Sequence, residues 1–437
     1  MKKGSTLKWT AASKCCVFLL LGGCSDKITD TGEAAAFLFD ETTISRLLRH
    51  RFDEPLPASP TNWVADNADA AKLGQYLFFD KNLSGNGEVS CTSCHLPDHG
   101  FSDTTTVSTA IGTTTRHTPT IVNTAFNRWH FWDGRCDTLW CQAASPLEAP
   151  DEHGSSRLQI AHYIHDTPDL NAAYTNIFGA LPALDEADRF PPRGRPVPEN
   201  TEDPHHIAWA TMNADDQESV TQLFINIAKA IAAYERKIIQ HNAPFDQMLE
   251  AFESGDSSGG DALSNAAKRG GELFVGEGLC WACHAGATFS NKEFHNVALP
   301  VAPDIDNESE GRFEGIGLLL SNPFNSSGAY SDDTTDADIK LGHLVQSPEQ
   351  VGTFKTPGLR NLLDTPPYMH GGHFDTLQEV VEHYNDMDDP PPSGHREELL
   401  FPLMWDEQQM ADVVAFLESL QGAPIDSELL EQPTSPH

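Results

Sequence analysis

Two short segments of the form C-x-x-C-H constrain this chain more than any other feature of its sequence. One runs from Cys91 to His95 and the other from Cys280 to His284. In c-type haem attachment, the two thiols form thioethers with the haem and the adjoining histidine ligates the iron. Zinc sites and disulfides also use C-x-x-C pairs, but a zinc site does not require the next-residue histidine in both copies. The sequence therefore predicts two covalently attached haem c groups. The predicted attachment residues are Cys91, Cys94, His95, Cys280, Cys283 and His284.

The two segments have matching surroundings. The pattern K-x-G-x-x-L-F precedes each one, at residues 72–78 and 268–274, and F-S-D or F-S-N follows at 101–103 and 289–291. Three matched elements in the same order, 189 residues apart, indicate a duplicated domain.

Hydrophobic periodicity predicts an all-α fold of two cytochrome c-like haem domains with long loops. Apolar residues recur at helical spacing from Val220 to Ile238, and an amphipathic helix is also expected from about Asp406 to Leu420. A Pro-rich stretch at 181–204 is expected to be an irregular surface excursion, and a Ser/Gly-rich stretch at 251–262 to be a linker. The predicted limits are 37–250 for the N-terminal haem domain, 263–422 for the C-terminal haem domain and 423–437 for a loose tail.

The N-terminus has the form of a bacterial secretory signal. Lysines precede a short apolar run, and the sequence LGGC ending at Cys24 looks like a lipobox. Residues 1–23 are therefore expected to be removed, Cys24 to carry lipid and residues 24–36 to act as a tether; a cleaved signal without lipid is the alternative. This pattern predicts a periplasmic protein attached peripherally to the outer membrane.

Charge excludes one class of partner. The chain has 28 Lys and Arg against 64 Asp and Glu, a net charge of −36. Because contacts with phosphates need a basic surface, we expect no binding to nucleic acid.

From about residue 73 to residue 420 the chain resembles the bacterial di-haem cytochrome c peroxidase and MauG family. The resemblance rests on LFFDKNLSGNGEVSCTSCH (77–95), RHTPTIVNTAF (116–126), FWDGR (131–135), AIAAYER (230–236), GLCWACHAG (278–286), FHN (294–296) and TPGLRNLLDTPPYMHGG (356–372). It implies that the N-terminal haem reacts with peroxide and that the C-terminal haem relays electrons.

For the first haem, the resemblance implies that Glu152 is the distal acid, because it lies at the family's spacing after Trp132. A carboxylate there moves the proton during peroxide cleavage. Gln142 matches a position from which its amide could hold water or peroxide, and Trp132 matches the tryptophan between the haems. A solvated loop Glu, a helix-surface Gln and a packed Trp are the respective alternatives.

Many family members place a removable histidine ligand over the first iron, but this chain has Thr109 at that position. The first site therefore resembles the MauG branch, in which the iron is five-coordinate. The candidates for a replacement ligand are His99, His117, His130 and His153.

For the second haem, the resemblance implies that Tyr384 is the distal ligand, where peroxidases have Met and MauG has Tyr. The pattern from Asp375 to Tyr384 also predicts a capped helix with Tyr384 on its apolar face. A core Tyr384, with Met369 or Met387 as the ligand, is the alternative.

Family members also hold calcium through two carbonyls and an Asn. The carbonyl positions match Thr365 and Pro367, but His117 replaces the Asn. Because calcium prefers oxygen donors, this replacement leaves the binding of calcium undecided.

Two further cysteines are expected to be buried free thiols. On a helix, Cys136 and Cys141 would have Cα atoms roughly 8 Å apart, too far for an unstrained disulfide. A disulfide would need Cys136 to lie outside the regular helix.

The resemblance implies one function, the broader behaviour of the family, and leaves two alternatives. The first is reduction of hydrogen peroxide with electrons from a small cytochrome c or copper protein. The second, MauG-like, is oxidation of side chains on a partner protein, and the third is electron transfer without catalysis, with both irons six-coordinate.

Overall fold

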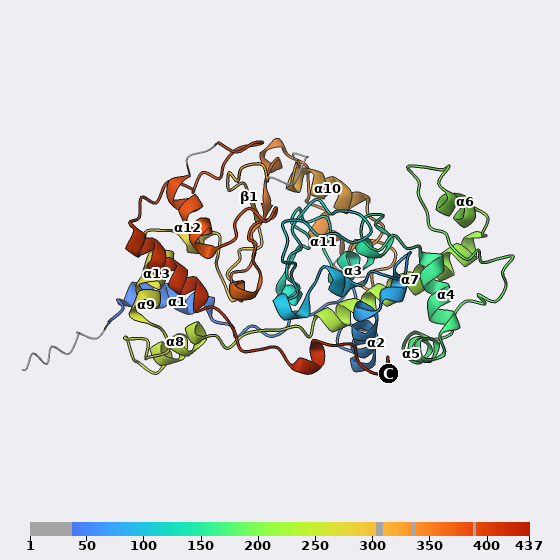
Figure 1. Ribbon diagram of the computed structural model, residues 1–437, viewed down its shortest axis with the longest axis horizontal. Coiled ribbons are helices and arrows are strands. Elements are labelled where there is room, and N and C mark those ends of the chain that lie inside the picture. The colour runs from blue at the N-terminus through green and yellow to red at the C-terminus, as the bar shows by residue number, and fades with distance from the viewer. Residues whose placement is uncertain (1–36, 303–308, 334, 336, 388–389) are drawn as a thin grey trace, which may run out of the picture. The chain divides into compact units, whose positions relative to one another are not determined.

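The computed structural model describes residues 37–302, 309–333, 335, 337–387 and 390–437, and these form a mostly helical protein (Figure 1). The predicted signal, lipobox and tether, residues 1–36, lie outside the described residues.

Two-residue strands β1 (Phe294–His295) and β2 (Phe354–Lys355) form an antiparallel pair. No helix in these ranges has the length and apolar character needed to cross a membrane. In chain order the helices are α1 (Glu41–Leu47), α2 (Ala68–Phe79), α3 (Leu139–Glu148), α4 (Arg157–Asp166), α5 (Pro168–Phe178), α6 (Pro204–Ala210), α7 (Ala214–Glu235), α8 (Pro244–Glu253), α9 (Asn265–Val275), α10 (Arg312–Ser321), α11 (Ala337–Leu341), α12 (Leu377–Asp386) and α13 (Glu407–Glu418).

Two helix pairs support the segments that precede the C-x-x-C-H motifs. Helix α2 packs against α7, and α9 packs against α13. Gly74 in α2 and Gly270 in α9 occupy the same place in the repeated K-x-G-x-x-L-F pattern. A Cβ atom on Gly74 would lie 1.9 Å from the carbonyl oxygen of Ala230, and one on Gly270 would lie 1.9 Å from that of Asp412. Both helix pairs therefore need glycine at the crossing, because any side chain would force the backbones apart.

The buried apolar side chains form two large clusters. Helices α2, α3, α4, α5 and α7 build the first cluster, which includes Phe78 and Trp140. Helices α1, α8, α9, α12 and α13 build the second cluster, which includes Phe245 and Phe416. Thus α1 and α8, which fall wholly or mostly within the predicted first domain, pack in the second cluster. The domain limits themselves stay a prediction.

A pair of asparagines, one from each half of the chain, lies where their segments meet the segment that follows α7. Asn123 and Asn361 both have a left-handed backbone, with φ of 59° and 65°. Their side-chain amides donate to the same acceptor, the carbonyl oxygen of Gln240, at 2.9 and 3.2 Å. Each asparagine ends a T-P-x-x-x-N sequence, at 118–123 and 356–361, so the duplication extends further than the three elements recognised in the sequence.

The C-terminal tail is packed rather than loose. Ile425, Leu429 and Leu430 pack against the first apolar cluster. The hydroxyl of Tyr234, on α7, donates to the carbonyl oxygen of Leu429 at 2.6 Å. The prediction failed because the partners of these residues lie far away in the sequence.

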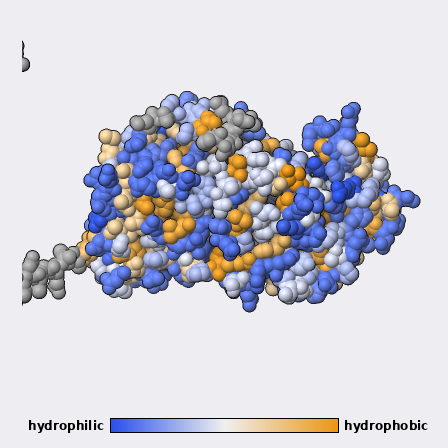
Figure 2. Space-filling view, in the orientation of Figure 1, coloured by the Kyte–Doolittle hydropathy of each residue, from blue (hydrophilic) through white to orange (hydrophobic). Residues whose placement is uncertain are grey.

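The Pro-rich stretch contains no helix or strand between residue 181 and the start of α6, although Phe190 within it is buried. Hydrophilic residues cover most of the face seen in Figure 2, and apolar residues form separate small patches on it. Such a face agrees with the strongly acidic composition.

Candidate active site

The first C-x-x-C-H segment forms a tight turn that prepares its histidine for a metal. Residues Cys91–Ser93 form a 3-10 helix, and the backbone N–H of His95 donates to the carbonyl oxygen of Cys91 at 2.9 Å. Nδ1 of His95 donates to the carbonyl oxygen of Phe101 at 3.0 Å. Because Nδ1 then carries the proton, Nε2 of His95 has the lone pair that an iron requires.

The second segment repeats this geometry. Residues Cys280–Ala282 form a 3-10 helix, and Nδ1 of His284 donates to the carbonyl oxygen of Phe289 at 2.9 Å. Phe101 and Phe289 both have φ of 54°, an uncommon conformation for phenylalanine. All four cysteines are free thiols. Both sites thus fit covalent haem c, with two thiols and one oriented imidazole in each.

The residues that support these phenylalanines were missed in the sequence. The hydroxyl of Ser102 donates to the carbonyl oxygen of Thr118 at 2.7 Å, and that of Ser290 donates to the carbonyl oxygen of Thr356 at 2.7 Å. The signal was present in both repeats, as the Ser of F-S and the Thr of T-P-x-x-x-N. These bonds tie the loop that orients each histidine to the second repeated motif.

Glu152 lies beside the first segment, in the loop that follows α3. It is half-buried, and its carboxylate is close enough to Cys91 and Cys94 to raise the pKa of both thiols, although burial is the larger cause. Burial also raises the pKa of Glu152 itself, against the opposing charge of Arg135. The structure therefore brings Glu152 to the first predicted haem site, where a carboxyl with a raised pKa is suited to proton transfer. Gln142 is half-buried on α3, the helix that leads to this loop.

Two of the candidate replacement ligands lie near the first segment. His153 is buried, with Nε2 3.9 Å from Sγ of Cys91, and its Nδ1 has no partner among the described residues. His117 bonds through both ring nitrogens, Nδ1 to the carbonyl oxygen of Thr105 at 2.9 Å and Nε2 to the hydroxyl of Ser102 at 3.1 Å. In this arrangement His117 has no nitrogen left for an iron.

The structure gives the remaining positions less support as ligands of the first iron. Thr109 and His99 are exposed. His130 is buried, and burial together with Lys340 and Lys355 lowers its pKa to about 3.

A cavity of about 340 Å³ adjoins the second segment. Its walls include Cys280, Cys283 and His284, and α12 contributes Tyr384. Burial raises the pKa of Tyr384, and the charges of the two nearby cysteines raise it further. Met369 also lines this cavity, whereas Met387 is the buried residue that caps the end of α12. Tyr384 is thus placed in the cavity that faces His284, as the predicted ligand must be.

Trp132 borders the same cavity and connects it to the first half of the chain. The indole N–H donates to the carbonyl oxygen of His117 at 2.8 Å, and the indole meets the ring of His370 edge-on at 6.3 Å. Thr365 and Pro367 also line the cavity. No cluster of three or more acidic, His or Cys groups suited to a metal occurs in the part of the chain that the structure describes. The calcium site stays a prediction.

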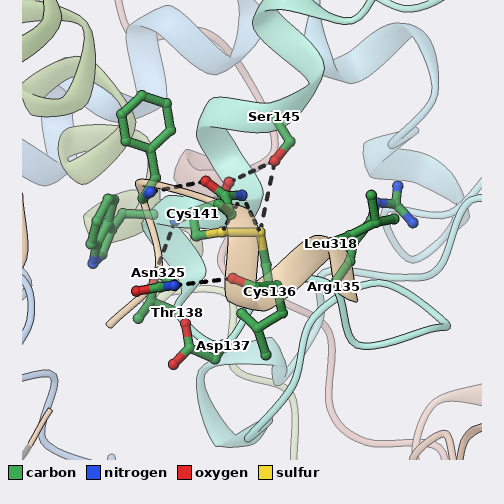
Figure 3. The surroundings of a disulfide bond; sticks show 12 residues. Arg135, Cys136, Asp137, Thr138, Cys141, Ser145, Leu318 and Asn325 are labelled. Carbon is green, nitrogen blue, oxygen red and sulfur yellow. Dashed lines mark hydrogen bonds between the residues drawn. A yellow bond between two sulfur atoms is a disulfide. The ribbon is translucent and has the colours of Figure 1, made fainter. Parts of the chain in front are cut away.

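The prediction of free thiols at Cys136 and Cys141 is wrong. They form a disulfide with Cα atoms 5.7 Å apart, and Figure 3 shows it where the chain enters α3. Thr138 caps α3 through its side chain, so the helix begins only at Leu139 and Cys136 lies outside it. The amide of Asn322 contacts both sulfurs, at 4.0 and 3.5 Å. The bond therefore ties the FWDGR segment, which carries Trp132, to the helix that carries Gln142.

The chain is similar to known proteins over most of its length. The family model for di-haem cytochrome c peroxidase matches residues 68–254. Cytochrome-c peroxidase IdrP1 of Denitromonas iodatirespirans is 33% identical over 377 residues, which are 84% of this chain and 85% of that protein. This chain belongs to the di-haem cytochrome c peroxidase family. The methylamine utilization protein MauG of Methylorubrum extorquens is 29% identical over 403 residues, 92% of this chain and 90% of that protein.

A solved structure supports the membership of this chain in the family. A MauG-like protein associated with microbial copper homeostasis superposes with a TM-score of 0.58 at 26% identity, covering 88% of this chain and 99% of that one. Membership makes the chain a haem oxidoreductase with haem c cofactors. The roles of the individual site residues stay predictions.

Proposed function

We propose that this protein reduces hydrogen peroxide to water with electrons from a small cytochrome c or copper protein. The observation that carries the proposal is the difference between the two histidine sites. Beside Cys91 and Cys94 lies the carboxyl of Glu152, whose pKa is raised by burial. The cavity at His284 is lined by the phenol of Tyr384. The first site is equipped for proton transfer and the second for ligation.

The chain's own residues have distinct roles in this proposal. Haem c bound at each site supplies an iron, for peroxide at the first and for electron relay at the second. As in c-type haem attachment, the first haem is held by Cys91, Cys94 and His95, and the second by Cys280, Cys283 and His284. Glu152 accepts a proton from peroxide and returns it to the departing oxygen, and Gln142 orients peroxide through its amide. Trp132 carries electrons between the two sites.

Glu152→Gln tests this proposal. The amide keeps the shape of the side chain but cannot accept the proton, so peroxide turnover is expected to fall by roughly 10²–10⁴-fold. Steady-state assays with a reduced cytochrome measure the loss, and the absorption spectrum checks that both haems are still attached. Asp151→Asn, at the exposed neighbouring position, is the matched control. Unchanged turnover in Glu152→Gln would remove Glu152 from the mechanism. A wild-type protein whose two low-spin haems do not react with peroxide would overturn the proposal in favour of an electron carrier.

A MauG-like oxidation of a partner protein is the second candidate, and Tyr384 favours it. A tyrosinate ligand donates more charge to iron than a thioether does and so stabilises oxidised states. Tyr384→Met tests this assignment. The variant is expected to change the low-spin ferric signal in EPR spectra and to raise the potential of the second haem. An unaltered low-spin signal would exclude Tyr384 as the ligand.

The proposal also includes export to the periplasm and lipid attachment at Cys24, as the lipobox predicts.

A further inference from the structure

A lysine lies over the face of the predicted electron carrier. Strand β2 places Lys355 beside the FWDGR segment, and its backbone N–H donates to the carbonyl oxygen of Trp132 at 2.8 Å. The ammonium nitrogen of Lys355 lies 5.9 Å from the centroid of the Trp132 indole. This distance is within the range of a cation–π interaction. The backbone bond holds the two residues together, so the contact is built into the fold.

Lys355 lines the cavity that adjoins the second C-x-x-C-H segment. Within the described ranges, Lys355 takes part in no ion pair, whereas the buried Lys229 is paired with Asp332. Burial lowers the pKa of Lys355 to about 8. Such an ammonium can lose its proton near physiological pH.

Other ionisable side chains lie on the elements around Lys355. Asp133 and Arg135 of the FWDGR segment form an ion pair with each other. His130 and His370 have pKa values well below 6.5 because they are buried, and both are neutral near pH 8. His295, on the paired strand β1, bonds to the carboxylate of Glu397, whose pKa is lowered. Arg116 lies over the ring of Phe354 and remains a cation. Lys355 is therefore the group expected to titrate beside Trp132.

We infer that Lys355 controls electron transfer through Trp132: its ammonium opposes loss of an electron from the indole, and loss of the ammonium proton permits it. This inference rests on the proposed function, in which Trp132 carries electrons between the two haem sites. A cation on the face of an aromatic ring stabilises the neutral indole and repels a positive one.

The charges and electrons of this step balance. Peroxide on the His95 side takes up two electrons and two protons to give two waters. Each electron in turn leaves the indole, and one electron from the His284 side refills it each time. The proton of the Lys355 ammonium passes to water when the indole becomes positive and returns from water when the indole is refilled. One positive charge then replaces another, and the local charge is unchanged.

Two substitutions and two measurements test the inference. Lys355→Met removes the charge at every pH, and Lys355→Arg keeps it at every pH. The first measurement is the rate of electron transfer between the haems after mixing with peroxide, from pH 6 to pH 10. The second is the ultraviolet resonance Raman signal of Trp132, obtained by subtracting the Trp132→Phe spectrum, which needs no turnover and no substitution of Lys355.

In wild-type protein both the rate and the Raman signal are expected to change with a midpoint near pH 8. At pH 6 the Lys355→Met rate should exceed the wild-type rate on the order of tenfold and stay flat with pH. The Lys355→Arg rate should stay at the slow level. A Trp132 signal that does not titrate in wild-type protein, or a midpoint that persists in Lys355→Met, would overturn the inference. If Trp132→Phe slows transfer while the Lys355 variants match wild type, only the role of Lys355 fails. If Trp132→Phe leaves the rate unchanged, the electron path in the proposed function fails instead.

Discussion

Glu235 is a carboxyl held in an apolar setting at the end of α7. Its side chain is 3% exposed, and Oε2 has no hydrogen-bond partner among the described residues. Burial raises its pKa from 4.5 to about 8. Its carboxylate also contributes to the raised pKa of Cys91, so the group lies near the first haem segment. We expect Glu235 to be largely protonated at neutral pH.

This burial predicts a pH dependence of stability. Between pH 4.5 and 8 the folded protein holds a proton on Glu235 that the unfolded chain has released. The free energy of unfolding should therefore fall as pH rises through this window, by up to about 1.4 kcal/mol per pH unit from this group. Glu235→Gln should flatten the slope, and Glu250→Gln, at an exposed position, should not. Denaturant unfolding of the haem-loaded protein at pH 5 and pH 8 measures it, and equal slopes in Glu235→Gln and wild type would contradict the prediction.

At the scale of elements, the repeated glycines set how closely the helices pack. Gly74 faces the backbone of α7, and Gly270 faces the backbone of α13. In contrast, a Cβ on Gly317 of α10 would meet only the side-chain amide of Gln346, at 3.1 Å. A flexible side chain can move aside, whereas a helix backbone cannot do so without repacking.

Gly74→Ala and Gly270→Ala should therefore destabilise the protein. Each is expected to lower the free energy of unfolding by roughly 1–3 kcal/mol or more, because the helices must separate. Gly317→Ala is the matched control and should be neutral or stabilising by up to about 1 kcal/mol, since alanine favours a helix. Thermal unfolding followed by circular dichroism compares the three. A Gly74→Ala protein as stable as wild type would mean that the crossing tolerates a side chain.

At the scale of the whole molecule, the last residues of the chain fasten the first half of the fold. Gln75 on α2 donates to the carbonyl oxygens of Glu428 and Glu431, at 2.6 and 2.9 Å. Tyr234 on α7 donates to the carbonyl oxygen of Leu429. The tail follows α13, which packs in the second cluster, so one segment contacts both halves.

Removing residues 424–437 should loosen α2 and α7 without detaching the second haem. Hydrogen exchange measured by mass spectrometry is expected to become faster in α2 and α7 and to stay unchanged in α9 and α13. Removal of residues 434–437 alone, which leaves the contacts of Gln75 and Tyr234 intact, is the control. If the longer deletion left exchange in α2 and α7 unaltered, the tail would have no role in holding this half together.

Local patterns in the sequence were enough to predict much of this architecture and its attachment points. The helix near the C-terminus was expected from about Asp406 to Leu420, and α13 spans Glu407–Glu418 after its Asp406 cap. The haem-binding turns were also predictable, because a cysteine pair and the next histidine lie within a single turn of chain. The family resemblance directed attention to Glu152 and Tyr384 by their spacing, and the structure brings each near one pair of cysteines.

The sequence by itself determined what depends on neighbouring residues: the capped starts of α12 and α13, the two C-x-x-C-H turns and the glycine of each repeat. Only the tertiary structure decided the disulfide of Cys136, the packed tail, and the position of Lys355 over Trp132. The disulfide depends on the start of α3 at Leu139, which leaves Cys136 outside the helix. The packed tail and the contact of Lys355 with Trp132 depend on two segments meeting in space. No local pattern encodes such a meeting, because a side chain's partner across the fold depends on how all the intervening elements pack.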